Sequence, residues 1–353
     1  MSEPEKKKRR PVKRWIILAL IAAGIYCAYI GPTILAPISP VVSVPGEPTG
    51  LQIGDFVITN TMLATLLSDL ILLIMAIVAG RYVARGNLVP AGFYNFFEVL
   101  VEFTWNTVQG ASAKWAKRIF PITATIFLII FVANMVKMIP GFESIGRLEQ
   151  SHGNSGYAPV ELFNIAGLSV YTIDKGQPVE VSHAETGEEH AETGETEEHA
   201  EEGDELCTAC EVIPYLRGSA TDLNFTFGLA ISAVVLTQVF GAMALGPGYF
   251  SKFFQFRQLI SGGPFGAINF GVGFLEIILE FAKILSFGFR LFGNIFAGAL
   301  LLSIIGALLP VIIPPGLYLF EVFFGIIQAY VFFLLATIFI SSATVGHGGE
   351  EHH

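Results

Sequence analysis

The feature that most constrains the fold is an apolar run from 265 to 309, near the end of the 353-residue chain. As a helix this run would be about 67 Å long at 1.5 Å per residue. That is more than twice the roughly 30 Å hydrocarbon core of a bilayer. We therefore expect a helix that tilts steeply, bends or splits in the membrane. Pro310, Pro314 and Pro315 end the run, and another apolar run follows at 317–343.

Further apolar runs and the composition agree on the class of protein. The chain is 53% hydrophobic and 14% charged, with a mean hydropathy of +0.62. These values are too apolar for an ordinary soluble domain. They predict an all-α polytopic membrane protein with about six membrane helices, of which the last two are long and tilted. The earlier runs lie at 15–36, 62–80, 119–139 and 223–245.

Basic residues set the expected orientation. Positions 6–14 hold seven Lys and Arg residues, so the positive-inside rule places the basic N-terminus, 1–14, in the cytoplasm before a retained first span. A cleaved signal peptide has a similar layout, but no small-residue cleavage pattern follows an h-region of ordinary length. We also expect the polar tail, 346–353, in the cytoplasm.

The segments between these runs have distinct compositions. Residues 37–60 are rich in Pro and Gly and predict an outer loop with a short hairpin. Residues 61–147 combine two spans with an amphipathic helix, predicted over 90–118 at the cytoplasmic interface. Residues 148–218 are an acidic outer insert, expected to be partly disordered, and 219–345 contain the remaining membrane helices.

The insert concentrates the acidic charge. Residues 180–211 hold 13 acidic side chains and no Lys or Arg, against a net charge of −10 for the chain. The rest is therefore only slightly basic, and nothing indicates nucleic-acid binding. The His-rich repeat at 183–199 predicts a solvated disordered loop, with weak metal binding or proton buffering as alternatives. Cys207 and Cys210 predict a local disulfide, with free thiols or a metal site as alternatives.

A permanently charged side chain lies within the long run. Arg290 cannot lose its proton, and a charge at a helix centre costs about 2.5–3.5 kcal/mol on insertion scales. It therefore needs an aqueous pocket, an anionic partner or both. Steps of three and four residues place six polar side chains on one helical face: Glu276, Glu280, Lys283, Ser286, Arg290 and Asn294.

Such a ladder can simply join helices, but its two cations favour a functional site. No carboxylate lies one turn from Arg290, so its counter-charge must come from another helix or another subunit. In the last run, Glu321 and Gln328 are seven residues apart and share a face. We expect Glu321 to be the intramolecular carboxylate and Gln328 a neutral partner of the guanidinium.

Several motifs resemble subunit a of the F-type ATP synthase membrane sector. The most specific is Arg-Leu-Phe-Gly-Asn at 290–294, within a matching stretch at 283–298 and followed by Gln-Ala-Tyr-Val-Phe at 328–332. The other matching segments are 90–98, 131–141 and 219–224, and the resemblance covers roughly 50–147 and 215–345.

The resemblance implies that Arg290 faces a ring of c subunits, each with a membrane carboxylate that two offset proton half-channels load and unload. It also implies a b-subunit peripheral stalk, a soluble catalytic head and a place in the lipid bilayer of a bacterial inner (plasma) membrane. Residues 219–345 would then be the proton-channel helices. The expected proton path comprises Asn134, Asp222, Asn224, Glu276, Glu280, Lys283, Ser286, Asn294, Glu321 and Gln328.

Three positions depart from the family pattern. Many relatives carry a Glu nine residues after the arginine and a His seven residues before the glutamine, whereas this chain has Ala299 and Glu321 there. The carboxylate has thus moved to the other helix. Lys137 stands where several relatives have a neutral or acidic residue.

Other classes of function fit the sequence less well. The chain has no Walker-type phosphate loop, so ATP chemistry would belong to partners, and this chain would be a non-catalytic component without cofactor or metal. A stand-alone secondary transporter or ion channel is the alternative, but such proteins often contain inverted repeats, and the Arg290 segment has no duplicate. A purely structural anchor does not explain the costly arginine. We expect H⁺ rather than Na⁺ as the transported ion.

Overall fold

The computed structural model describes residues 12–33, 45–84, 92–139, 141–151, 155–165, 168–180, 207–253, 263–311 and 313–345. The chain forms two compact units, each built from three segments. Unit 1 comprises Met1–Val42, Ser144–Pro214 and Leu301–Leu317, and unit 2 comprises Ser43–Glu143, Tyr215–Leu300 and Tyr318–His353.

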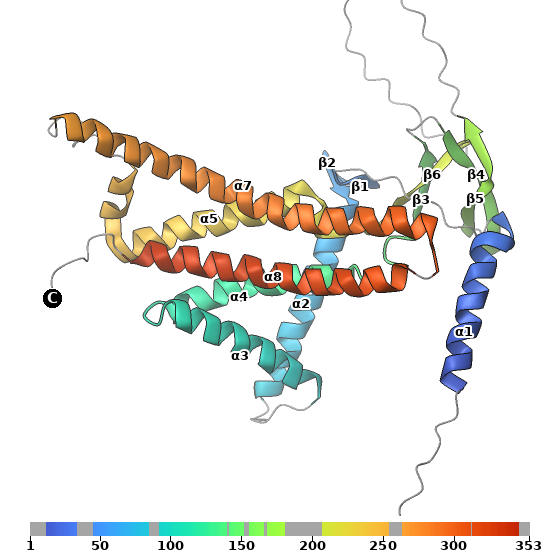
Figure 1. The fold of residues 1–353 in the computed structure, drawn as a ribbon, viewed down its shortest axis with the longest axis horizontal. Helices are drawn as coiled ribbons and strands as arrows, with labels where there is room; N and C mark the ends of the chain where they lie inside the picture. Colours follow the sequence, from blue (N-terminus) through green and yellow to red (C-terminus); the bar gives the residue numbers. More distant parts are fainter. Residues whose placement is uncertain are drawn as a thin grey trace, which may run out of the picture. The chain divides into compact units, whose positions relative to one another are not determined.

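Long apolar helices dominate the described residues (Figure 1). Five are long and apolar enough to span a membrane, which confirms an all-α polytopic membrane protein. The first predicted span is shorter, an apolar helical stretch at Arg14–Ile30 formed by α1 (Val12–Ile25) and a π-helical turn (Tyr26–Ile30). The longer helices are α2 (Asn60–Ala84), α4 (Ala116–Val136), α5 (Leu223–Leu245), α7 (Gly263–Leu308) and α8 (Pro314–Thr344).

The long apolar run forms one continuous helix. α7 has 46 residues, about 69 Å at 1.5 Å per residue, so of the three alternatives of tilting, bending and splitting, the split does not occur. In unit 2, α7 packs beside α8 in antiparallel orientation: the rings of Phe287 and Phe332 are 4.8 Å apart, and those of Phe287 and Phe339 are 5.6 Å apart. α2 runs steeply across the direction of both helices (Figure 1). A membrane that α2 crosses directly would therefore contain α7 and α8 at a strong tilt.

The core of unit 2 is formed by residues of α3 (Phe93–Ala111), α4, α5, α7 and α8. Phe333 and Leu291 are fully buried within it. On α7 the buried side chains Phe287, Leu291 and Ile295 recur every four residues, so they form one stripe along the helix. Arg290 lies directly beside this stripe and is exposed. Core packing thus fixes the rotation of α7 and with it the direction of the arginine.

The amphipathic helix is shorter than predicted. α3 (Phe93–Ala111) ends before the basic residues of the 90–118 segment, and Lys117 and Arg118 belong to the first turn of α4. α3 packs on α4 through the edge-to-face rings of Trp105 and Phe120, 5.2 Å apart. The sequence boundary was wrong because charge and aromatic pattern continue across the turn between the two helices.

Local residues explain the ends of α5. The Asp222 carboxylate accepts a hydrogen bond from the Asn224 backbone N–H and caps the first turn. Gly246 ends the helix at φ 68°, a left-handed conformation that favours glycine. A 3₁₀ turn (Ser219–Thr221) precedes α5, and another (Gly246–Lys252) follows it.

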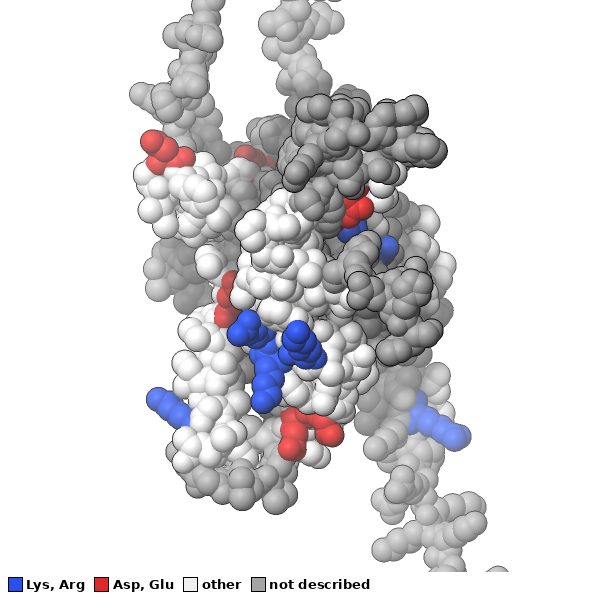
Figure 2. Space-filling model, turned by 90° about the vertical axis from the view of Figure 1, so that its left-hand side faces the viewer, with Lys and Arg blue, Asp and Glu red and all other residues white. Residues whose placement is uncertain are grey.

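The predicted short hairpin is present in the 37–60 segment. β1 (Pro48–Ile53) pairs antiparallel with β2 (Phe56–Thr59), and Gly54 takes a positive φ of 64° in the turn. Figure 2 shows that charged side chains are sparse on one face of the molecule and that most of the described surface there is uncharged. This surface is typical of a protein that contacts lipid or apolar partners.

Unit 1 contains a four-stranded antiparallel sheet that the sequence analysis did not predict. Its order is β3-β6-β4-β5, and Gly146 pairs with Pro214 and Gln150 with Cys210 between β3 and β6. These strands are an ordered part of an insert that is expected to be partly disordered, whereas the repeat at 183–199 lies outside the described residues. The strands are β3 (Gly146–Gln150), β4 (Ser155–Ile165), β5 (Leu168–Glu180) and β6 (Cys210–Pro214).

The cysteine prediction is confirmed. Cys207 and Cys210 form a disulfide beside the start of β6, with their Cα atoms 5.4 Å apart. This bond rules out the alternatives of two free thiols or a Cys-ligated metal in this state. Within the described ranges, no group of three His, Cys, Asp or Glu side chains could hold a metal ion.

Candidate functional site

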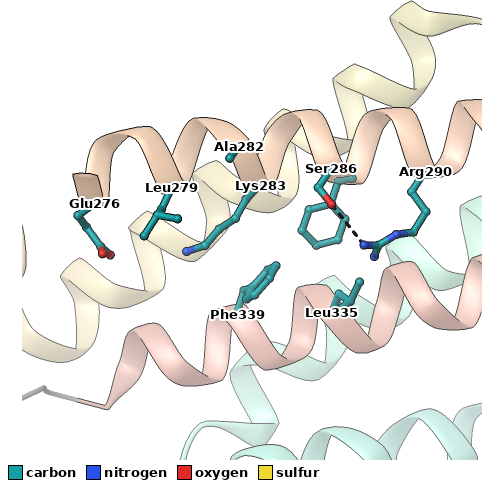
Figure 3. A pocket seen from close by; sticks show the side chains of 9 residues that line it. Glu276, Leu279, Ala282, Lys283, Ser286, Arg290, Leu335 and Phe339 are labelled. Atoms are coloured by element: carbon teal, nitrogen blue, oxygen red, sulfur yellow. Dashed lines mark hydrogen bonds between the residues drawn. The ribbon is translucent and has the colours of Figure 1, made fainter. Parts of the chain in front are cut away.

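The polar ladder of α7 faces α8 across an open pocket of about 300 Å³. Figure 3 shows the Lys283 and Glu276 side chains pointing into the space between the two helices, with Phe339 and Leu335 on the opposite side. The predicted common face is therefore confirmed. The lining residues are Glu276, Leu279, Ala282, Lys283, Ser286, Phe287, Arg290, Leu335 and Phe339.

Arg290 has a neutral partner in this pocket. Its Nη2 donates a hydrogen bond to the Ser286 Oγ over 3.2 Å, one turn back on α7 (Figure 3). In the part of the chain that the structure describes, no carboxylate forms an ion pair with it. The Arg290 residue is exposed, and its neighbour Phe289 is 56% exposed. A hydroxyl satisfies one N–H group but leaves the charge uncompensated.

Lys283, the second cation of the ladder, is already paired. Its Nζ lies 2.9 Å from the Glu280 Oε1 on the same helix. It also lies 5.1 Å from the centre of the Phe339 ring on α8, within the range of a cation–π contact. Lys283 therefore cannot take the place of Arg290 as an uncompensated charge.

The partners predicted for Arg290 are wrong. Glu321 forms an ion pair with Lys137, which follows α4, and Gln328 accepts a hydrogen bond from the Asn294 Nδ2 over 2.7 Å. The antiparallel packing of α7 and α8 explains this result. Gln328 lies opposite Asn294, and Glu321, seven residues earlier on α8, lies about 10 Å farther along the helix axis. It reaches the level of Gly298, where an added Cβ would lie 3.7 Å from the Glu321 carboxylate.

The Lys137–Glu321 pair is deeply buried. The two side chains are only 5% and 7% exposed. Burial of charge is costly unless the charges are paired, so each residue requires the other. Sequence reasoning missed Lys137 as part of the site, although a lysine and a glutamate in separate apolar spans were a signal that the two could meet.

Two buried amides keep atoms without a partner: Asn134 lies where α4 meets α8, and Gln328 lies where α8 meets α7. The Asn134 Nδ2 donates to the Gly325 carbonyl over 3.3 Å, and Gly325 permits this approach because an added Cβ would lie 3.1 Å from the Asn134 Cβ. The Asn134 Oδ1 and the Gln328 Nε2 are buried and have no hydrogen-bond partner among the described residues. Buried polar atoms normally find partners, so these two interfaces can form additional hydrogen bonds.

Asp222 and Asn224 belong to a separate cluster. Asp222 is buried, and its carboxylate accepts a hydrogen bond from the Thr61 Oγ1 over 2.6 Å. Gly46 leaves room for that carboxylate, since an added Cβ there would lie 2.9 Å from it. Asn224 contributes its backbone N–H, and its side chain is exposed. Neither residue lines the Arg290 pocket, and no sequence pattern indicated Thr61.

Comparison with known proteins decides the family. Residues 62–341, well over half of the chain, match the family described as ATP synthase A chain. The chain belongs to the ATP synthase A chain family. The resemblance to subunit a of the membrane sector is thereby confirmed, and the chain is a multi-pass membrane protein of an ATP synthase.

Relatives in the ATP synthase A chain family have low sequence identity to this chain, but two of them align with most of its length. The ATP synthase subunit a of Moorella thermoacetica is 23% identical over 299 residues, covering 84% of this chain and 95% of that protein. The ATP synthase subunit a of Mycobacterium marinum is 25% identical over 312 residues, covering 86% and 94%. ATP synthase subunit a 2 of Picosynechococcus sp. is 35% identical over 133 residues, covering 37% of this chain and only 52% of that protein.

The buried ion pair of this ATP synthase A chain generates a stability prediction. Lys137→Met leaves the Glu321 carboxylate buried without a cation and should lower the free energy of unfolding by about 3–5 kcal/mol. Lys137→Met combined with Glu321→Leu removes both charges and should recover most of that loss. Thermal unfolding in mild detergent measures both effects. A double variant no more stable than the single variant would show that the charges do not depend on each other.

Proposed function

We propose that this chain is the stator subunit of a rotary F-type ATP synthase and couples proton flow to rotation of a ring of c subunits. Arg290 provides the essential cation facing the ring carboxylates, and two proton half-channels load and unload those carboxylates. The observation that carries the proposal is the exposed guanidinium on the polar face of an otherwise apolar helix, α7, where the Ser286 hydroxyl is its hydrogen-bond partner among the described residues.

Electrostatics explains how one exposed cation can couple proton flow to rotation of the ring. A deprotonated carboxylate in lipid is costly, so a ring carboxylate must be protonated or face a cation. Arg290 offers a cation at one point of the rotation only. Its charge also repels a proton that would pass directly between the half-channels, so proton flow requires rotation. A membrane potential supplies about 2.3 kcal/mol per charge per 100 mV.

The polar residues on either side of Arg290 define the path. We assign Asn134, Asp222, Asn224, Glu276, Glu321 and Gln328 to the outer half-channel, and Asn294 to a position near the ring. Support comes from the buried Asn134 Oδ1 and Gln328 Nε2, which have no partner among the described residues and can hydrogen-bond a proton-carrying chain of water molecules. The remaining ladder residues of the path are Glu280, Lys283 and Ser286.

The partners and the location follow from the same role. Several relatives are named ATP synthase subunit a, which supports assembly with a c-subunit ring, a b-subunit peripheral stalk and the soluble catalytic head. Those partners would perform the ATP chemistry. We assign the chain to a bacterial inner membrane, with both termini in the cytoplasm because of the basic segment at 6–14.

The role of Arg290 predicts a loss of coupling. Arg290→Ala should abolish ATP-driven proton pumping in inverted membrane vesicles, because no cation remains to meet the ring carboxylate. Arg147→Ala is the matched control, since that arginine lies on β3 and pairs with Glu149. The control should pump at the rate of the unaltered protein. Normal pumping by Arg290→Ala would exclude the assigned role.

The path assignment predicts slower transport when the buried pair is replaced. Lys137→Met with Glu321→Leu should assemble but pump protons about tenfold more slowly, because the path loses an ionisable carboxylate. Arg147→Met with Glu149→Leu removes an ion pair from β3 and serves as the control. Vesicle acidification at equal amounts of assembled complex provides the measurement. Equal rates for the two double variants would remove Glu321 from the path.

A further inference from the structure

A second ionisable residue lies at membrane depth and has no role in the path described above. Asp69 belongs to α2, one of the five helices able to span a membrane. Nine residues separate it from the start of the helix, about 13 Å, which places it near the middle of a roughly 30 Å hydrocarbon core. The side chain is exposed, and none of the described residues forms an ion pair or hydrogen bond with it.

Asp69 lies within an exposed apolar seam. Leu66, Leu70, Leu73 and Ile77 are all exposed, with Leu73 at 57%. Their spacing of three and four residues places them on one side of the helix together with Asp69. Spacing of this kind is typical of a surface that packs against another helix. The seam therefore has the pattern of an interface but no partner among the described residues of unit 2.

The opposite side of α2 is already used. Its buried residues, Asn60, Thr61, Ala64 and Ser68, lie in the first part of the helix, where α2 contacts α4. Only 11% of its most apolar window is buried, as for α7, whereas the corresponding shares for α4 and α8 are 50% and 44%. α2 and α7 are thus the two least buried spans. Arg290 lies on α7, so the exposed surface of α2 needs a separate explanation.

We propose that this seam docks a membrane helix of another subunit that carries a lysine or arginine at the depth of Asp69. A carboxylate near the bilayer centre is costly unless it is paired or protonated, and such residues usually mark functional contacts. A basic side chain on the docked helix neutralises Asp69, while its apolar residues cover Leu66, Leu70 and Leu73. Charge complementarity fixes both the identity and the depth of the partner.

Other occupants fit the seam less well. A second copy of this chain on the same seam would bring Asp69 close to another Asp69, and like charges repel. A helix that presents a carboxylate at this depth would meet the same repulsion, so its complement is Arg290 rather than Asp69. Lipid alone would leave the acid without a hydrogen-bond partner at the costliest depth.

Crosslinking in the complete complex tests the proposal. A photoreactive amino acid in place of Leu73, with Asp69 retained, is activated in native membranes, and mass spectrometry identifies the attached peptide. We expect a membrane segment of another subunit with a Lys or Arg at matching depth. Asp69→Asn should reduce this crosslink about tenfold, whereas the matched control Asp55→Asn, in the outer hairpin, should leave it unchanged.

Charge reversal and an independent readout complete the test. Asp69→Lys, combined with replacement of the partner's basic residue by Asp, should restore the crosslink. The proposal is overturned if Leu73 attaches only to lipid, to this chain or to a segment without a basic residue. It is also overturned if Asp69→Asn leaves the crosslink unchanged. Arg290→Ala should keep the crosslink, so this inference and the rotary role can fail separately.

Discussion

A charge that cannot be neutralised, placed in an apolar helix, sets the conditions for the rest of this structure. The guanidinium of Arg290 lies on the face of α7 beside the core stripe, and two carboxylates of α7 and α8 are paired with other cations. Lys137 pairs with Glu321, and Lys283 pairs with Glu280. These two lysines compensate Glu321 and Glu280, so neither carboxylate forms an ion pair with the arginine. Arg290 therefore keeps a positive charge that a carboxylate of another polypeptide can compensate.

The helices differ in how deeply they are buried: two form much of the core, and two expose most of their apolar surface. α4 and α8 bury about half of their most apolar windows, while α2 and α7 bury only a tenth. The aromatic contacts of Phe287 with Phe332 and Phe339 hold α7 in a fixed rotation against the core. A rigid support of this kind keeps Arg290 at one position while a partner moves past it, which is the property a stator requires. The ionisable residue on α2 has the opposite sign, so the two exposed helices suit different partners.

Sequence patterns predicted the elements better than the contacts between them. The span at 223–245 coincides with α5, and the spacing from Glu276 to Asn294 correctly indicated one face of a long helix, because both depend on local periodicity. The partner of Glu321 was wrong because it depends on the register between α8 and its neighbours, which no local pattern encodes. The sheet of unit 1 was missed because the acidic composition of the insert outweighed the alternation of Val170, Tyr171 and Thr172 in β5.

The orientation of Arg290 in the assembled complex is the decisive observation. A structure of the intact membrane sector, at a resolution that shows side chains, measures the distance from its guanidinium to the nearest carboxylate. The account predicts that this carboxylate belongs to another polypeptide, lies within about 4–6 Å in at least one rotational state and changes partner between states. A guanidinium paired with a glutamate of its own chain in every state, or facing lipid with no other chain nearby, would contradict the account.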